Sequence, residues 1–191
     1  MKKKYKVLLI IAIVLVSLIA LFYGGSFVFY KYVIHANVIE HDSSPVFIHS
    51  KATDAKKAFV IYQPGRTGKV KDMAYNIAKG LNDSSFEVTI DYPGEKIKKD
   101  ISEYSVIVFG TPVYESHPSP VLLDYIKSVG DFSGKKVIVF SSGYLKDSPE
   151  LDKIKALIKN PGTYKAIKFV SSDNDNTDKA YKLGRNAAEG N

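Results

Sequence analysis

Short apolar runs alternate along most of the chain with longer segments in which apolar residues recur at helical spacing. Polar turns rich in glycine, proline, asparagine or serine separate these segments. The runs that predict β-strands are 58–62, 86–90, 106–109, 137–140 and 164–170. The segments that predict amphipathic helices are 69–81, 120–129, 149–158 and 174–188. Because strands and helices alternate, we expect an α/β fold in which a five-stranded parallel sheet is covered by helices on both faces.

Two of the expected helices begin at a serine followed by a proline. Ser119 precedes Pro120, and Ser148 precedes Pro149. Serine at the N-cap accepts a hydrogen bond from an amide of the first turn, and proline at the first helical position costs no hydrogen bond. Gly130 marks the expected end of the first of these helices.

A long apolar segment precedes the α/β pattern. No charged residue occurs from Val7 to Tyr30, and these 24 residues span roughly 36 Å as a helix, enough to cross a bilayer. By the positive-inside rule, the basic cluster before the segment predicts a cytoplasmic N-terminus and an extracytoplasmic globular domain. We therefore expect a single-pass anchor in the cell membrane. A cleaved signal peptide is the alternative, although the run is long for one and no clear A-x-A site follows it.

The chain accordingly divides into four expected segments. They are a basic N-terminus at 1–6, a transmembrane anchor at 7–30, a linker at 31–56 and an α/β domain at 57–191. Within the linker, Val46-Phe47-Ile48 is apolar enough to pack locally or to form a short strand.

Composition and charge exclude several classes of function. The chain has no cysteine, so disulfides, thiolate metal sites and cysteine nucleophiles are excluded. Four lysines within the first six residues account for much of the net charge of +7, and no arginine-rich patch with interleaved aromatics suggests nucleic-acid binding. The histidines of the linker have no metal-ligand spacing, and 173–178 resembles a calcium loop but lacks its glycine and its final glutamate. We expect no metal and no nucleic acid.

Three loops at the ends of predicted strands carry the most unusual residues, namely 63–69, 111–118 and 141–147. In a parallel sheet these loops meet beyond the carboxyl ends of the strands, where ligands bind. The first loop lies between a buried strand and a helix N-terminus, whose amides and dipole favour an anion. It is the candidate phosphate-binding loop, with the residues Gln63, Pro64, Gly65, Arg66, Thr67, Gly68 and Lys69.

Two segments resemble the flavodoxin family. The segment Val60-Ile61-Tyr62 through Thr67-Gly68 to Met73-Ala74 is similar to the family's first strand, S/T-x-T-G-N-T phosphate loop and first helix. The segment Val106-Ile107-Val108-Phe109-Gly110-Thr111-Pro112-Val113-Tyr114 is similar to its third strand and G-S/T-P-x-Y loop. The resemblance covers residues 57 to about 188. It implies the strand order 2-1-3-4-5 and flavin mononucleotide (FMN) bound where the strand order reverses.

The resemblance also implies which residues would contact FMN. Residues 63–69 would bind the phosphate, with Arg66 and Lys69 supplying charge because Pro64 stands at the family's first hydroxyl position. The ring would lie between the two later loops, near Thr111, Pro112, Val113, Tyr114, Ser141, Gly143 and Tyr144. Tyr114 and Tyr144 are the candidates for stacking on the ring. An electron carrier requires no catalytic side chain, and none is expected.

Two functions follow from this sequence. The first is an FMN-binding domain tethered to the membrane that transfers electrons to a redox partner protein or reduces a small substrate. The second is a flavin-free binding or scaffold module at the cell surface that keeps the fold. The altered residues of 63–69 favour the second function, and the aromatic loops at the strand ends favour the first.

Overall fold

The structure is a computed structural model that describes residues 2–189. It divides into two compact units, one up to His35 and one from Ala36 onward. The first unit is formed by most of α1, a single helix over Lys2–Val38. Its segment Lys4–Tyr32 is long and apolar enough to cross a membrane, and none of its apolar side chains is buried in the protein. Signal sequences near an N-terminus can also be apolar enough to meet this criterion, so membrane anchoring stays a prediction.

The second unit is built on a mixed sheet of six strands in the order β1-β3-β2-β4-β5-β6. Their bounds are β1 Val46–Ile48, β2 Lys57–Tyr62, β3 Glu87–Asp91, β4 Tyr104–Pro112, β5 Lys136–Gly143 and β6 Thr163–Val170. The expectation of a purely parallel five-stranded sheet is therefore wrong, because β1 pairs antiparallel with β3 at the edge. Without β1, the remaining strands are all parallel and follow the order 2-1-3-4-5.

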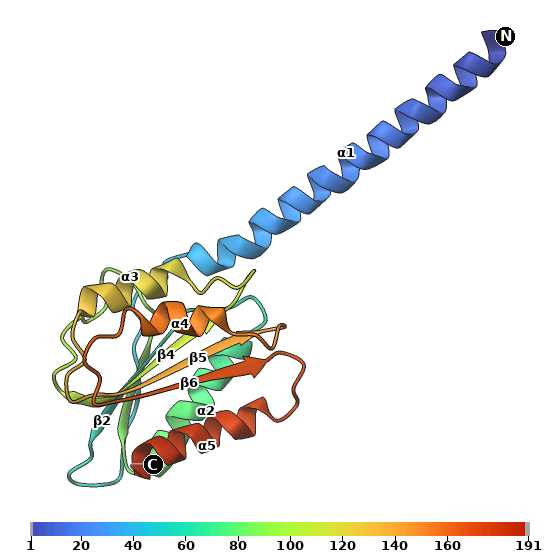
Figure 1. Cartoon of the computed structure of the whole chain (residues 1–191). Helices are drawn as coiled ribbons and strands as arrows, with labels where there is room; N and C mark the ends of the chain where they lie inside the picture. Colours follow the sequence, from blue (N-terminus) through green and yellow to red (C-terminus); the bar gives the residue numbers. More distant parts are fainter. Residues whose placement is uncertain (1, 190–191) are drawn as a thin grey trace. The chain divides into compact units, whose positions relative to one another are not determined.

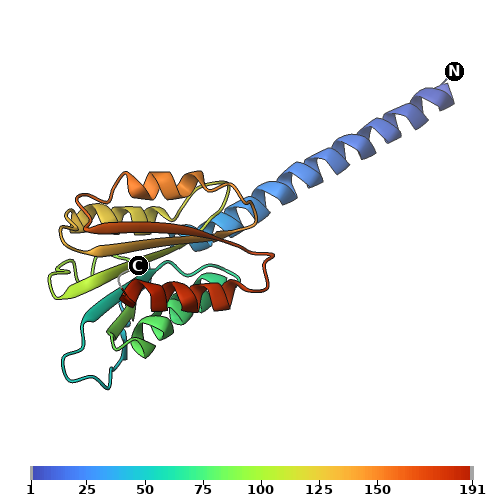
Figure 2. The ribbon, with the colours of Figure 1, turned by 60° about the horizontal axis from the view of Figure 1, so that its bottom comes forward.

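Helices cover both faces of the sheet (Figures 1 and 2). One face packs against α2 and α5, and the other packs against α3 and α4. The bounds are α2 Lys69–Asp83, α3 Pro120–Val129, α4 Pro149–Lys155 and α5 Asn176–Glu189. The helices therefore begin within about two residues of the expected positions, and α3 has the expected bounds.

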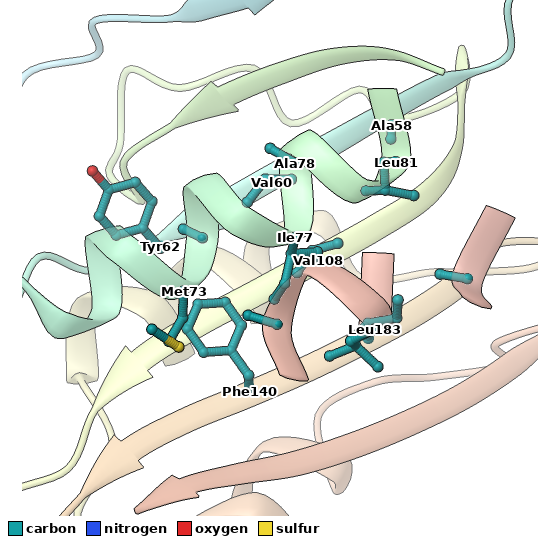
Figure 3. Packing of buried hydrophobic residues seen from close by; sticks show 14 of the residues in the cluster. Ala58, Val60, Tyr62, Met73, Ile77, Ala78, Leu81, Val108, Phe140 and Leu183 are labelled. Carbon is teal, nitrogen blue, oxygen red and sulfur yellow. The ribbon is translucent and has the colours of Figure 1, made fainter. Parts of the chain in front are cut away.

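The core on the α2 side shows why these segments fold together. Val60 and Val108 project from neighbouring strands, and Ile77 of α2 packs onto them (Figure 3). Below this layer α2 and α5 approach closely through glycines. A Cβ placed on Gly184 would lie 2.1 Å from the carbonyl oxygen of Ile77, and one placed on Gly80 would lie 2.2 Å from that of Tyr181. Only glycine permits this distance between the two helix backbones.

The expected cap of α3 is present. The Ser119 hydroxyl accepts a hydrogen bond from the amide of Leu122 at 3.4 Å and donates one to the carbonyl oxygen of Asn37 at 2.8 Å. Ser119 and Asn37 are both buried. Gly130 ends the helix, as expected. Ser148 occupies the same position before α4, but its side chain makes no capping hydrogen bond.

We expect Ser119→Ala to lower the free energy of unfolding by about 1–2 kcal/mol, because it removes a helix cap and leaves a buried carbonyl without its donor. Denaturation of the detergent-solubilised chain followed by circular dichroism measures this change. Ser148→Ala is the matched control, and it should cost less than about 0.5 kcal/mol because no cap bond is lost. Equal effects of the two substitutions would contradict the role assigned to Ser119.

The expected linker at 31–56 is largely ordered structure. Its first residues belong to α1, and 46–48 form β1. Residues 37–44, here called the strap, are bonded to the domain at several points. The carbonyl oxygen of Ile39 accepts a hydrogen bond from the Gln63 side chain at 2.9 Å, and Glu40 accepts one from the amide of Glu95 at 2.5 Å. The strap is therefore part of the folded domain.

The far end of the strap is held by one carboxylate. Asp91, at the end of β3, is buried, and it accepts hydrogen bonds from the Ser43 hydroxyl at 2.6 Å and from the Ser44 amide at 2.9 Å. The amide of Tyr92 donates a third at 2.8 Å. The His41 ring packs against the Tyr92 ring, with 5.2 Å between their centroids. These contacts explain why a polar segment with little sequence periodicity is ordered.

Candidate functional site

The loops after β2, β4 and β5 lie together at the carboxyl edge of the sheet. The strand order reverses between β2 and β4, and the helix after β2 covers one face while the helix after β4 covers the other. In open α/β sheets ligands bind at such a point, between the two connections that leave in opposite directions, and this place is here called the crevice. The expected meeting of 63–69 with 111–118 is therefore built into the topology.

The turn at the start of α2 has the backbone features of an anion site. Gly68 adopts a left-handed conformation, with φ of 71°, and is the N-cap of this 15-residue helix. Because glycine has no side chain, the cap supplies no side-chain hydrogen bond to the first-turn amides. Gly65 lies against the next loop, since a Cβ placed there would be 3.2 Å from the Cβ of Pro112. The dipole and the amides of α2 are thus presented at the crevice without a side-chain oxygen from the cap.

The side chains of 63–69 divide into two groups. Arg66 and Thr67 are exposed, and Pro64 is half-buried. Gln63 is buried, and its side chain donates to Ile39 of the strap. The Lys69 ammonium donates to the carbonyl oxygen of Ser171, in the turn after β6. The Gln63 and Lys69 side chains therefore contact the strap and the turn after β6.

The loop after β4 folds back on itself as a tight hairpin. Tyr114 and His117 exchange two backbone hydrogen bonds, at 3.2 and 2.9 Å. Between them Glu115 and Ser116 have φ values of 50° and 61°, the pair of positive values that a type I′ turn requires. Such values are unfavourable for residues other than glycine. The conformation is maintained by hydrogen bonds such as that from the Lys153 ammonium to the Ser116 carbonyl, at 3.1 Å.

Tyr114 links the second loop to the first. The amide of Arg66 donates to the Tyr114 hydroxyl at 3.4 Å, and the Tyr114 side chain is half-buried. Thr111, by contrast, is fully buried, and its hydroxyl accepts a hydrogen bond from the Ser119 amide at 2.9 Å. Thr111 therefore shapes the loop from below, whereas Tyr114 lies over the candidate phosphate loop.

The loop after β5 carries exposed apolar side chains. Tyr144 is 77% exposed and Leu145 is 64% exposed. From residue 57 onward, they are the only large hydrophobic side chains that are mostly exposed within the described part of the chain. Ser141 and Gly143, at the end of the strand, are buried. The amide of Val113 donates to the carbonyl oxygen of Ser142 at 2.9 Å, which holds this loop beside the previous one.

Solved structures with the same arrangement are flavodoxins and flavodiiron cores. A flavodoxin from the domain Archaea is 21% identical, and the match covers 70% of this chain and 97% of that protein with a TM-score of 0.53. The flavodoxin of Streptococcus pneumoniae TIGR4 is 16% identical, with coverage of 71% and 99% and a TM-score of 0.58. The Flv1 flavodiiron core of Synechocystis is 18% identical, with coverage of 72% and 36% and a TM-score of 0.57.

The second unit has a flavodoxin-like fold. No protein-family model matches the sequence, and a search of curated proteins finds no match. At these identities the structural likeness shows the fold alone. The fold therefore matches the resemblance seen in the sequence motifs. The ligand depends on the residues of this chain at the carboxyl edge.

Residues at the carboxyl edge have the chemistry that the phosphate and the ring of FMN would require. The phosphate end offers the uncapped N-terminus of α2, with Arg66 and Thr67 at the surface. The ring end offers Tyr114 and Tyr144 from two adjacent loops. The buried Thr111 and Ser141 side chains are bonded within the domain, so only the backbone of these two positions remains for a ligand.

Burial also determines the electrostatics just below the crevice. Tyr62, the last residue of β2, is buried, and its ring packs edge-on to that of Tyr92 with 5.3 Å between centroids. Burial, together with the Tyr92 hydroxyl, raises the pKa of Tyr62 far above its ordinary value. The phenol therefore stays neutral over the physiological range and adds no charge beneath the crevice.

Two cavities lie beside the strap and are lined by none of the three loops. One, of about 230 Å³, is lined by 40–43, Tyr92 and 94–97. The other, of about 420 Å³, lies between the strap and α3. Within residues 2–189, no group of three or more histidine, aspartate or glutamate side chains could hold a metal ion.

Sequence reasoning missed three features of this region. It did not identify the strap, whose polar residues have no periodicity, or the exposed Leu145 next to Tyr144. It also missed the buried pair of Glu150 and Lys168. A signal for that pair was present, because Lys168 lies within the expected strand 164–170, where a buried lysine requires a partner.

Proposed function

We propose that this chain is a membrane-tethered protein whose flavodoxin-like domain binds FMN at the carboxyl edge and transfers electrons. The observation that carries the proposal is the exposure of Tyr144 and Leu145 at the loop after β5. Exposed apolar side chains at a ligand crevice indicate a surface that a bound group covers. A flat aromatic ring over Tyr144 would remove both from water.

The phosphate end supports the same ligand. A phosphate at the N-terminus of α2 would gain from the first-turn amides and from the helix dipole. Arg66 would add a charge-assisted contact, and the Thr67 hydroxyl a further hydrogen bond. Lys69 would contribute its backbone amide in the first turn of α2, since its ammonium is bonded to Ser171.

The bound flavin would supply the redox chemistry, and the protein would position it and exclude water from one face. The N-terminal helix would keep this domain at the membrane surface. The redox partner would then be a protein or small molecule that reaches the same surface. By the positive-inside rule we place the domain outside the cytoplasm.

The test is a titration of the purified full-length chain with FMN in detergent, followed by flavin absorption and fluorescence. We expect saturable binding by the native chain. Tyr144→Ala should raise the Kd for FMN by about five- to hundredfold, because stacking of an aromatic side chain on a base-like ring contributes about 1–3 kcal/mol. Tyr23→Ala is the control, since Tyr23 is a tyrosine of the N-terminal helix and belongs to none of the three loops.

A flavin-free scaffold is the second candidate, and one observation favours it. The Gln63 and Lys69 side chains, which lie at the phosphate loop, already bind Ile39 and Ser171. A folded native chain that leaves the FMN spectrum unchanged at millimolar concentrations would overturn the flavin proposal and favour this candidate.

A further inference from the structure

An oppositely charged pair is buried beneath the loop after β5. The Lys168 side chain on β6 is 8% exposed, the Glu150 side chain at the start of α4 is 0% exposed, and Nζ lies 2.5 Å from Oε1. The Ser141 hydroxyl donates to the same Oε1 at 2.7 Å. The other carboxylate oxygen, Oε2, has no hydrogen-bond partner among the described residues. All the contacts of this carboxylate thus hold one oxygen next to the ammonium.

A buried ion pair of this kind contributes little to the stability of the fold. Removing two charges from water costs about as much as their attraction returns, and apolar residues of similar volume are often equally stable. Several other ion pairs between described residues of the domain lie on its surface. In Lys57–Glu103 and Lys79–Asp83, for example, every side chain is at least 36% exposed. The burial of Lys168 therefore calls for an explanation from its location.

That location is directly under the two loops proposed to hold the flavin ring. A Cβ placed on Gly143 would lie 3.2 Å from the Lys168 ammonium and 3.2 Å from the Cβ of Val113. The ammonium is therefore next to the backbone of the loop after β5, at the point where that loop meets the loop after β4. Any larger residue at 143 would push against it.

We propose that Lys168, positioned by Glu150, is the residue of this domain that stabilises reduced FMN. The inference rests on the proposed FMN binding. A flavin that has gained two electrons and one proton carries one more negative charge than the oxidised form. Glu150 offsets part of the lysine charge, but the ammonium is the end of the ion pair that lies against Gly143, so the dipole of the pair favours a negative charge on the loop side. Lys168 would therefore raise the midpoint potential, and Glu150 would keep the ammonium in place.

The experiment compares the midpoint potential of bound FMN in full-length variants, with dithionite as the reductant and reference dyes as the indicator. The main variant is Lys168→Met with Glu150→Gln, which removes both charges at similar volume. It should bind oxidised FMN within about twofold of the native chain. Its relative affinity for reduced FMN should fall about tenfold, which lowers a two-electron potential by about 30 mV. Lys168→Arg, which keeps the charge, should restore most of the difference.

Two controls separate the buried charge from the general loss of a positive charge. Lys165→Met removes an exposed lysine from the same strand, and Lys155→Met removes an exposed lysine from α4. Neither should shift the potential. If the main variant does not fold, Lys168→Gln with Glu150→Gln replaces it, because two amides can keep the hydrogen bond.

The outcomes distinguish the two proposals. Failure of the native chain to bind FMN overturns both the proposed function and this inference. FMN binding with the same potential in the native chain and in the neutral variant overturns the inference alone. A lower potential that Lys168→Arg restores, with both controls unchanged, supports it.

Discussion

Gly184→Ala should lower the free energy of unfolding of the globular domain by about 3 kcal/mol, the upper part of the range for overpacked sites. The added methyl group would meet the Ile77 carbonyl oxygen at 2.1 Å, and the neighbouring atoms are backbone that cannot rotate away. Relief requires α5 to move away from α2, which would open the core of Figure 3 on that face. Chemical denaturation of the solubilised chain measures the loss.

Asn186→Ala, at an exposed position of the same helix, is the control. It should change stability by less than about 0.5 kcal/mol, or raise it slightly, because alanine has the higher helix propensity. If the two substitutions had similar effects, the close approach of α2 and α5 would not be a structural requirement.

Asp91→Ala should lower the free energy of unfolding by about 2–3 kcal/mol and release the strap. The substitution removes the acceptor of three hydrogen bonds to a charged group, and each such bond contributes about 1.5–3 kcal/mol before the freed donors are hydrated. Limited proteolysis at 37–44, together with denaturation, measures both effects. We expect cleavage within the strap at protease concentrations that leave the native chain intact.

The control for the strap is Asp91→Asn. Its amide oxygen can still accept from the Ser44 and Tyr92 amides, and its amide nitrogen can donate to the Ser43 hydroxyl. The free energy of unfolding of Asp91→Asn should fall by less than half as much as that of Asp91→Ala. An asparagine variant as protease-sensitive as the alanine variant would show that geometry at this site is not what orders the strap.

Most of the fold could be predicted from the sequence because the central parallel strands, at 58–62, 106–109 and 137–140, are continuous apolar runs and each helix has one apolar face. The cap at Ser119 and the end of α3 at Gly130 follow from local chemistry and were confirmed. A short strand at 46–48 was one of two alternatives, but its pairing with β3 could not be predicted. Val46 and Phe47 of β1 remain exposed at the sheet edge, so no pattern of burial marked their side chains.

The site was predictable in outline only. Topology brings 63–69, 111–118 and 141–147 to one edge of the sheet, and this was foreseen from the strand order. The partners of individual side chains were not foreseen. The contact of Gln63 with Ile39 joins residues 24 positions apart, and that of Lys69 with Ser171 joins residues 102 positions apart. No local pattern encodes such pairs.

If α1 is held in a membrane, the strap limits how far the globular domain can move from the end of that helix. Residues 39–45 alone connect the end of α1 to β1, and seven fully extended residues reach roughly 25 Å. The domain therefore stays within this short distance of the end of α1 even when every strap contact is broken. Encounters with a partner in the same membrane would take place within a thin layer, where a short tether gives a high effective concentration. A longer tether would lower this effective concentration. A partner that is free in solution would gain nothing from the tether.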